Sequence, residues 1–138
     1  MNLRTIDTDI CIYFMEGRYP SVADHFAETP VDELAIPAIV IAELRFGAVK
    51  SARASANLAR LDAFLAPFRQ LPFDASCAAQ FAEAKLFLQR RGRIIGAMDL
   101  LIAATALAND ATVVTNNVEE FSRVPGLRVE NWTIPTGS

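Results

Sequence analysis

Cysteine and histidine are scarce in this 138-residue sequence, which contains only Cys11, Cys77 and His25. Disulfide-stapled domains are far richer in cysteine, so we expect both thiols to be reduced core residues. A single histidine excludes a two-histidine ribonuclease mechanism and a histidine-rich zinc site within the chain. We expect His25 to have a packing or surface role. A Walker loop and a GxGxxG motif are also missing, so the known phosphate-binding loops are excluded.

Long apolar runs and an excess of positive charge are lacking too. The longest apolar run, residues 100–108, is far shorter than a membrane span. Charges near the N-terminus interrupt the apolar region that a signal peptide needs. We therefore expect a cytoplasmic protein without membrane contact. The net charge of −3 argues against a general nucleic-acid coat, but it permits an acidic site that reaches phosphates through a bound cation.

Short apolar segments alternate with helical patterns along the whole chain. Strands are predicted at residues 3–6, 33–36, 112–115 and 127–131, with a short extended piece at 70–73. Helices are predicted through 11–15 and at 21–28, 37–52, 54–68, 74–92, 97–110 and 118–124, with Ser21 as a cap and Pro37 in a first turn. This alternation predicts one α/β domain around a mostly parallel sheet.

Polar side chains follow two of the predicted strands. Asp7 and Asp9 come after the first strand, and Asn116 and Asn117 come after the strand at 112–115. In open parallel sheets, ligands bind at the carboxyl ends of the strands. This edge of the sheet is therefore the predicted site.

Two further carboxylates, Glu43 and Asp99, lie on apolar helix faces. Acidic side chains in such places are seldom buried without a partner. Structural roles stay open for each residue alone: Asp99 could complement the positive end of its helix, and Glu43 could pair with Arg45, Arg4 or another base. Asp7 could likewise be a helix cap.

Taken together, these carboxylates predict a cation site. Three or four of them at one sheet edge need positive charge, and ligation by oxygen alone suits Mg²⁺ or Mn²⁺. Because no nucleophilic triad can be assembled around the one histidine, the residues favour metal-assisted hydrolysis of a phosphate ester.

Three blocks of the sequence resemble the PIN-domain ribonucleases, and are most similar to the VapC toxins of bacterial toxin–antitoxin pairs. The blocks are LRTIDTDICIYFMEGR (3–18), AIPAIVIAELRFGAVKSAR (35–53) and GAMDLLIAATALANDATVVTNNVEEFSRVPGLRVENW (96–132), in the order and spacing of the family. The resemblance implies a single PIN-like domain over residues 1–138, folded as a three-layer α/β/α sandwich. It also implies a metal-dependent endoribonuclease that cleaves RNA, a homodimer and inhibition by a cognate VapB-like antitoxin.

The resemblance also assigns roles to the acidic residues. The three acidic positions of the family fall on Asp7, Glu43 and Asp99, which would hold one or two Mg²⁺ or Mn²⁺ ions. The ions would activate a water for in-line attack on a phosphodiester.

Two positions depart from the family pattern. Asn117 stands where the family often has an aspartate, and it would orient a water or accept a hydrogen bond, a role shared with Thr115 or Asn116. Asp9 stands where the family usually has an asparagine. It would order the site as a hydrogen-bond acceptor only, and its charge would tighten metal binding.

Basic and apolar surfaces supply weaker hypotheses about partners. Two basic clusters are candidates for RNA phosphate contacts, with solvated helix ends as the alternative: Arg45, Lys50 and Arg53, and Arg90, Arg91 and Arg93. Single-stranded or loop RNA is the expected target. Apolar residues at 12–14 and on the helix at 52–68 could face a dimer partner or an antitoxin helix, or simply the core.

Two rival functions remain open. DTDIC (7–11) resembles the DxDx[TV] motif of haloacid dehalogenase-like phosphatases, in which the first aspartate is the nucleophile. That family also needs a downstream lysine and a late acidic pair, whereas GAMDLL supplies a single aspartate. The second rival is a catalytically weak PIN-like module that binds RNA or a partner without cutting, motivated by Asn117 and Asp9.

Overall fold

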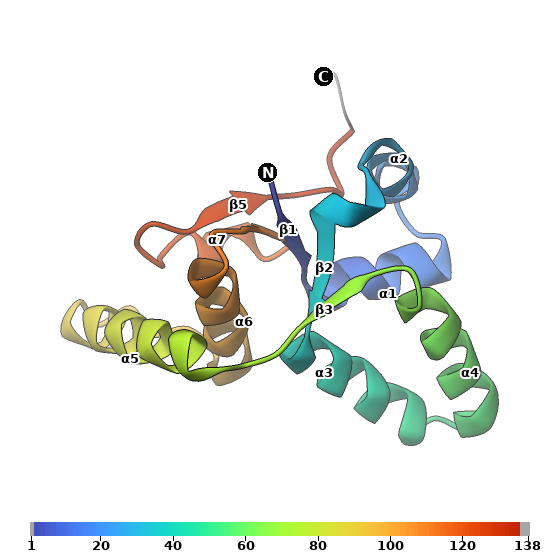
Figure 1. The fold of residues 1–138 in the computed structure, drawn as a ribbon, viewed down its shortest axis with the longest axis horizontal. Helices are drawn as coiled ribbons and strands as arrows, with labels where there is room; N and C mark the ends of the chain where they lie inside the picture. The colour runs from blue at the N-terminus through green and yellow to red at the C-terminus, as the bar shows by residue number, and fades with distance from the viewer. Residues whose placement is uncertain (1, 136–138) are drawn as a thin grey trace.

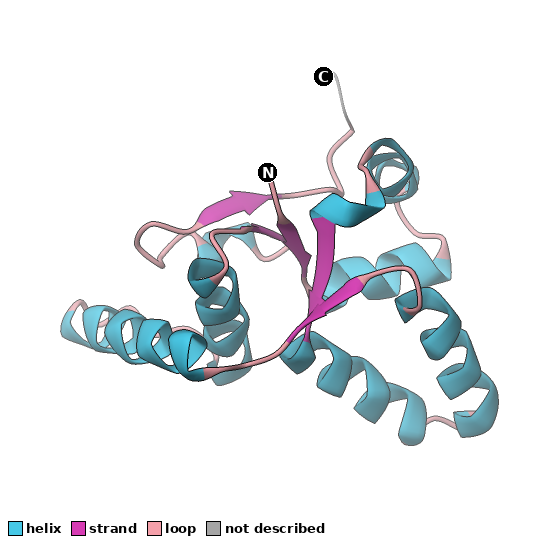
Figure 2. Ribbon diagram, viewed as in Figure 1, coloured by secondary structure: helices cyan, strands magenta, loops and turns pink. Residues whose placement is uncertain are grey.

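A five-stranded parallel sheet forms the centre of the protein, whose computed structural model describes residues 2–135 (Figures 1 and 2). The strands are β1 (Arg4–Ile6), β2 (Leu34–Pro37), β3 (Arg69–Leu71), β4 (Thr112–Val114) and β5 (Arg128–Glu130). The helices are α1 (Thr8–Glu16), α2 (Pro20–Glu28), a 3-10 turn η1 (Val31–Glu33), α3 (Ala38–Val49), α4 (Ala54–Leu65), α5 (Ala75–Arg90), α6 (Ala97–Ala108) and α7 (Val118–Phe121).

The strand order is β3-β2-β1-β4-β5, and every described pairing is parallel, so the prediction of a mostly parallel sheet is confirmed. Helices α1, α2 and α4 lie on one side of the strands and α5, α6 and α7 on the other (Figure 1). The two helical layers and the sheet form the three-layer α/β/α sandwich that the family resemblance implies. Because both faces of the sheet are covered, its three central strands are made of buried or nearly buried residues.

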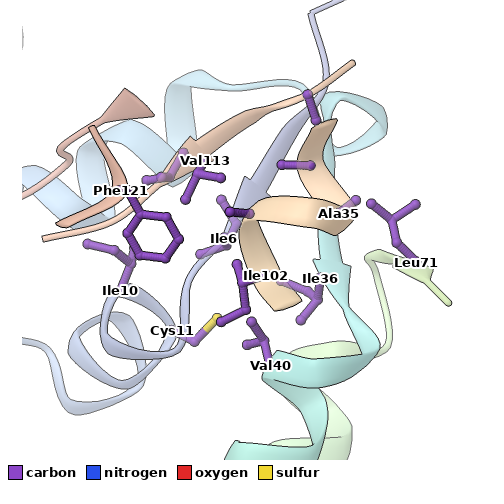
Figure 3. Packing of buried hydrophobic residues seen from close by; sticks show 14 of the residues in the cluster. Ile6, Ile10, Cys11, Ala35, Ile36, Val40, Leu71, Ile102, Val113 and Phe121 are labelled. Carbon is purple, nitrogen blue, oxygen red and sulfur yellow. The ribbon is translucent and has the colours of Figure 1, made fainter. Parts of the chain in front are cut away.

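The core lies where these layers meet. Ile6, Ile36 and Val113 from neighbouring strands pack with Ile102 of α6 and Phe121 of α7, all without solvent exposure (Figure 3). This packing fixes the strand ends from which the polar residues emerge. Burial of these aliphatic and aromatic side chains is the main contribution to the free energy of folding.

The two cysteines and the histidine lie as expected. Cys11 and Cys77 are buried and are not joined in a disulfide. His25 stacks on Trp132 with 5.0 Å between ring centroids and an interplanar angle of 6°. None of the helices within residues 2–135 is long and apolar enough to cross a membrane.

Local expectations about helix starts differ from the structure at three places. Helix α1 begins at Thr8, earlier than predicted, because the Asp7 carboxylate caps it. Pro37 was expected within the first turn of the third helix. It is instead the last residue of β2 and directly precedes α3. Ser21 does not cap α2, which begins at Pro20; its hydroxyl donates instead to the Trp132 carbonyl at 2.9 Å.

The helix predicted at 37–52 ends at Val49, and the other boundaries differ from the predicted ones by a few residues. The prediction of one domain over 1–138 includes residues 1 and 136–138, which lie outside the described residues. It stays a prediction.

Shortening a buried side chain of the core should lower the free energy of unfolding. Replacing the fully buried Ile102 with alanine is expected to lower the free energy of unfolding by about 2–5 kcal/mol, because it leaves a cavity under the sheet. Ile94→Ala, at a position that is 53% exposed, is the matched control and is expected to cost less than about 1 kcal/mol. Urea unfolding of both variants measures the difference, and equal losses would contradict this placement of the core.

Candidate active site

Asp7 occupies the point where β1 ends beside β4. Its backbone N–H donates to the Val114 carbonyl at 2.9 Å, which continues the parallel pairing by one residue. One carboxylate oxygen, Oδ1, accepts from the Thr8 N–H at 2.7 Å and so caps α1. The other, Oδ2, accepts from the Thr115 hydroxyl at 2.6 Å. The helix-cap alternative for Asp7 is therefore correct, and it coexists with a position at the predicted edge of the sheet.

Burial is the main influence on the Asp7 carboxyl, which is only 5% exposed. Burial, reinforced by the neighbouring charge of Asp9, raises the pKa of Asp7 from 3.8 to about 7. The hydrogen bonds from Thr115 and Thr8 act in the opposite direction and do not overcome the loss of solvation. The Asp99 carboxylate also raises this pKa, so the two groups lie close enough to repel each other.

Asn117 connects this aspartate to the next. Its backbone N–H donates to the Thr115 hydroxyl oxygen at 2.9 Å. Its side-chain Nδ2 donates to Asp99 Oδ2 at 3.2 Å and to Glu120 Oε2 at 2.8 Å. Asn117 therefore acts as a donor that holds two carboxylates together, which is a role that an aspartate at this position could not perform.

Asp99 lies in the first turn of α6 and is half-buried. Burial, followed by repulsion from Glu120, raises the pKa of Asp99 to about 6, and Glu43 and Asp9 add to the shift. The hydrogen bond from Asn117 opposes it. Carboxylates of α1, α3 and α7 thus act on one carboxyl group of α6.

Glu43 projects from α3 toward the start of α1. Its Oε1 accepts from the Thr8 hydroxyl at 2.7 Å. The alternative in which Glu43 pairs with Arg45 or Arg4 is not formed among the described residues, since the Arg45 guanidinium lies 3.2 Å from Asp62. Arg4 lies at the opposite end of β1, where it pairs with Glu33 at 3.5 Å and Glu130 at 3.0 Å.

Asp9 lies beside Asp7 and accepts hydrogen bonds from two backbone groups. Oδ1 accepts from the Ile10 N–H at 2.8 Å, and Oδ2 accepts from the Asn116 N–H at 3.3 Å. Burial raises the pKa of Asp9, while these N–H donors lower it. The residue thus acts as an acceptor, as predicted, and it ties the first turn of α1 to the segment after β4.

Glu120 belongs to the site although the sequence analysis did not single it out. Its Oε1 accepts from the Gly96 N–H at 2.6 Å, in front of α6. A Cβ atom at Gly96 would lie 3.6 Å from that oxygen and 4.0 Å from Asp99 Oδ2, so glycine leaves the space between the two carboxylates free. The spacing of Asn117 and Glu120, three residues apart in one helical turn, is the signal that could have revealed this contact.

The six candidate RNA-binding cations lie on the surface, and no ion pair or hydrogen bond joins them to the site carboxylates within residues 2–135. Lys50 lies 5.1 Å from the ring centroid of Phe46, and Arg91 lies 4.3 Å from that of Phe87. Arg93 lies 3.6 Å from Glu119. Arg53 directly precedes α4. Arg90 is the last residue of α5, which agrees with the helix-end alternative for the second cluster.

The acidic residues suit a hard divalent cation by their chemistry, although they are not arranged around one. Within residues 2–135, no group of three acidic, cysteine or histidine side chains is positioned to hold a metal ion. Asp7, Asp9 and Asp99 form no ion pair with a described lysine or arginine. Burial raises the pKa of all three, and repulsion from neighbouring carboxylates adds to the shift at Asp7 and Asp99. An excess of carboxylate oxygens without a basic partner is the donor set that Mg²⁺ or Mn²⁺ prefers.

The sequence profile of the PIN domain matches residues 5–127, which include every carboxylate of this site. The chain belongs to the PIN-domain family. The match spans β1 through the turn before β5, and so covers the elements that carry Asp7, Glu43, Asp99 and Asn117.

Known relatives of this PIN domain match almost its whole length. Ribonuclease VapC2 of Rickettsia felis is 40% identical over 128 residues, covering 92% of this chain and 96% of that protein. The tRNA(fMet)-specific endonuclease VapC of Shigella flexneri is 35% identical, covering 93% of this chain and 96% of that protein. A chain in the crystal structure of DNA-bound VapBC from Salmonella typhimurium superposes with a TM-score of 0.90 at 32% identity, covering 96% of this chain and 99% of that one.

The raised pKa of Asp7 predicts how stability depends on pH in EDTA. An acid with a raised folded-state pKa stabilises the fold fully below its unfolded pKa of 3.8, and this contribution is lost as pH rises through about 7. Asp7→Asn should therefore gain stability relative to the unaltered protein between pH 4.5 and 8, by about 2–4 kcal/mol.

Urea unfolding at several pH values measures the gain. Asp24→Asn, at an exposed position of α2, controls for the removal of one carboxylate. A free-energy difference for Asp7→Asn that stays constant across this range would contradict the buried placement of the carboxyl.

Repulsion from Glu120 predicts a second measurable shift. Glu120→Gln should lower the pKa of Asp99 from about 6, although not to 3.8, since burial is the larger cause. Carbon-13 NMR titration of the metal-free protein measures this pKa. Glu119→Gln removes the adjacent charge on the same helix and should leave the Asp99 titration unchanged; equal shifts in both variants would argue against the contact.

Proposed function

We propose that this PIN domain is a metal-dependent endoribonuclease that hydrolyses RNA phosphodiester bonds and acts as the toxin of a toxin–antitoxin pair. The observation that carries the proposal is the convergence of Asp7, Glu43 and Asp99 at the carboxyl edge of the sheet. The relatives named as VapC ribonucleases support the RNA substrate, and the VapBC complexes support the pairing with an antitoxin. A cytoplasmic location follows as part of the same proposal.

Asp7, Asp99 and Glu43 are the residues that would hold Mg²⁺ or Mn²⁺. When bound, such an ion lowers the pKa of a water and neutralises charge on the phosphate oxygens. Binding would also remove the repulsion that raises the pKa of Asp7 and Asp99, so both carboxyls would be ionised at neutral pH. Metal binding and proton release are therefore coupled at this site.

The remaining residues position these carboxylates. The Thr115 hydroxyl fixes Asp7, and the Thr8 hydroxyl fixes Glu43, each through one short hydrogen bond. The Asn117 amide fixes Asp99 and, through Glu120, the backbone in front of α6. These hydrogen bonds restrict the side chains before substrate arrives, which reduces part of the reorganisation that metal binding and hydrolysis would need.

The substrate we propose is RNA with exposed, unpaired bases, since these are the bases that protein side chains read most easily. The Shigella flexneri relative is named for tRNA(fMet), a folded RNA with single-stranded loops. Surface cations on α3, α5 and the loop that follows would contact phosphates away from the carboxylates: Arg45, Lys50, Arg53, Arg90, Arg91 and Arg93.

An antitoxin partner is supported by two largely apolar grooves, one between α1, α3 and α4 and one lined mainly by α1, α2 and the segment after α4. One groove of about 280 Å³ is lined by Ile12, Leu44 and Leu61 and has Glu43 in its wall. A second, also of about 280 Å³, is lined by Phe14, Phe26 and neighbouring apolar residues. An amphipathic helix of a VapB-like protein would fill such grooves and block access to Glu43.

A homodimer is supported by a different surface. Apolar side chains are exposed on α3, on α5 and around the start of α6: Phe46, Val49, Leu86, Ile94 and Met98. Burial of these side chains against a second copy of the chain would remove them from water and stabilise a dimer.

The phosphatase rival receives less support. A haloacid dehalogenase-like nucleophile needs a free carboxylate oxygen beside a lysine. Asp7 has both oxygens in hydrogen bonds, and no lysine within residues 2–135 contacts it. A binding module without activity would need no cluster of buried, mutually repelling carboxylates.

Asp99→Asn is expected to reduce RNA cleavage by roughly 100-fold or more, because it removes a charge that a divalent ion needs. Cleavage of a fluorescent loop RNA with Mn²⁺, and its loss in EDTA, measures the effect. Asp24→Asn is the matched control and should cleave as the unaltered protein does. Undiminished cleavage by Asp99→Asn, or by the unaltered protein in EDTA, would overturn the metal-dependent assignment.

A further inference from the structure

A group of neutral polar side chains borders the carboxylates on the β5 side of the site. Asn116 follows β4 and Asn131 follows β5, and the Thr115 N–H donates to the Glu130 carbonyl at 2.9 Å, which holds these two strand ends together. The Asn131 side-chain Nδ2 donates to Asn116 Oδ1 at 3.4 Å, and the Thr133 hydroxyl oxygen lies 3.3 Å from the same Oδ1. We call Asn116, Asn131 and Thr133 the amide ledge.

The ledge touches the acidic site directly. The Asn116 N–H donates to Asp9 Oδ2 at 3.3 Å, while its two sequence neighbours are the residues that bind Asp7 and Asp99. Its side chain points to the other side, toward Asn131. Asn116 therefore lies between the carboxylates and Asn131.

The ledge is built rigidly for a surface feature. Trp132 lies between Asn131 and Thr133 in the sequence and is 1% exposed. Its indole N–H donates to the Glu130 carboxylate at 3.1 Å. The Asn131 side-chain oxygen accepts from both the N–H and the hydroxyl of Thr133, at 2.9 and 2.8 Å. A buried anchor and these bonds fix the outward side chains before any ligand binds, which reduces the entropic cost of recognition.

The unused hydrogen-bonding groups of the ledge are donors. Both acceptor oxygens, on Asn116 and Asn131, already take hydrogen bonds from within the ledge. The Asn116 Nδ2 has no acceptor among residues 2–135, and Asn116 is exposed to solvent. No ion pair brings a described lysine or arginine to the ledge, and Asp9 adjoins it. Neutral donors beside a carboxylate suit an uncharged acceptor rather than a phosphate.

We infer that the amide ledge binds the base of an RNA nucleotide flanking the scissile phosphate, by donating from Asn116 Nδ2 to a carbonyl oxygen of that base. The inference rests on the proposed ribonuclease function and adds a residue that sets its specificity. Guanine O6 and uracil O4 are carbonyl oxygens, whereas adenine and cytosine carry amino groups at the corresponding positions N6 and N4. The ledge therefore favours a guanine or a uracil at one position next to the cut.

Asn116→Asp is the sharpest test, because it replaces the free donors with acceptors in the same shape. An RNA pool with random bases on both sides of the cut is cleaved with Mn²⁺ and the products are sequenced. The unaltered protein should enrich guanine or uracil at one flanking position. Asn116→Asp should shift that position toward adenine or cytosine by about 5-fold. Asn116→Ala should lower kcat/KM for the preferred RNA about 3- to 10-fold, with the larger share in KM.

Controls separate reading of the base from folding and from charge. Asn2→Asp adds the same charge at the opposite end of β1 and should retain the base preference of the unaltered protein. Thr133→Val leaves Asn116 in place but removes one of its supports, and should weaken the preference without reversing it. Thermal unfolding of each variant shows whether it is folded. An unchanged base distribution for Asn116→Asp and Asn116→Ala would overturn the inference.

A binding measurement distinguishes failure of this inference from failure of the proposed function. The same RNA pool is selected for binding to Asp99→Asn, with and without Asn116→Asp, in the presence of Mg²⁺. If the unaltered protein cleaves no RNA but Asn116→Asp still changes the bound bases, the ribonuclease proposal fails and the ledge stands. If the unaltered protein cleaves and neither the cut nor the bound pool changes, the ledge fails alone.

Discussion

The parallel pairing of β1 with β4 is the constraint on which the rest of the site depends. It places the Asp7 N–H against the Val114 carbonyl and so brings the Asp7 carboxylate to the Thr115 hydroxyl. That hydroxyl in turn receives the N–H of Asn117, whose side chain reaches Asp99. Two carboxylates carried by distant elements are thus tied together through three hydrogen bonds that start from one strand pairing.

The cluster of carboxylates lowers the stability of the folded protein. Asp7 and Asp99 lose solvation and repel each other, and only neutral N–H and O–H donors offset the cost. A basic partner would stabilise the cluster more but would also occupy the place of a divalent cation. No described lysine or arginine forms an ion pair with Asp7 or Asp99, as is common where activity and stability conflict. The apolar packing beneath it, at Ile6, Ile102 and Val113, supplies the stability that the edge lacks.

Much of this arrangement was predictable because the chain repeats simple signals. Apolar strands of three or four residues between helical patterns indicate a covered parallel sheet, and carboxylates on apolar faces, such as Glu43 and Asp99, stand out against their neighbours. The sequence does not determine a hydrogen-bond partner where a side chain has several plausible ones. Ser21 bonds a carbonyl far along the chain, and Glu43 selects the Thr8 hydroxyl over an arginine. Only the tertiary fold determines such choices, and the position of Glu120 in front of α6 is of the same kind.

The hydrogen bond between Thr115 and Asp7 joins residues 108 positions apart. During synthesis, Asp7 leaves the ribosome first, but its partner follows only when most of the chain has been made. Contacts of such long separation form late, after the intervening segments have come together. The acidic edge therefore assembles only after β1 and the segment that follows β4 have come together.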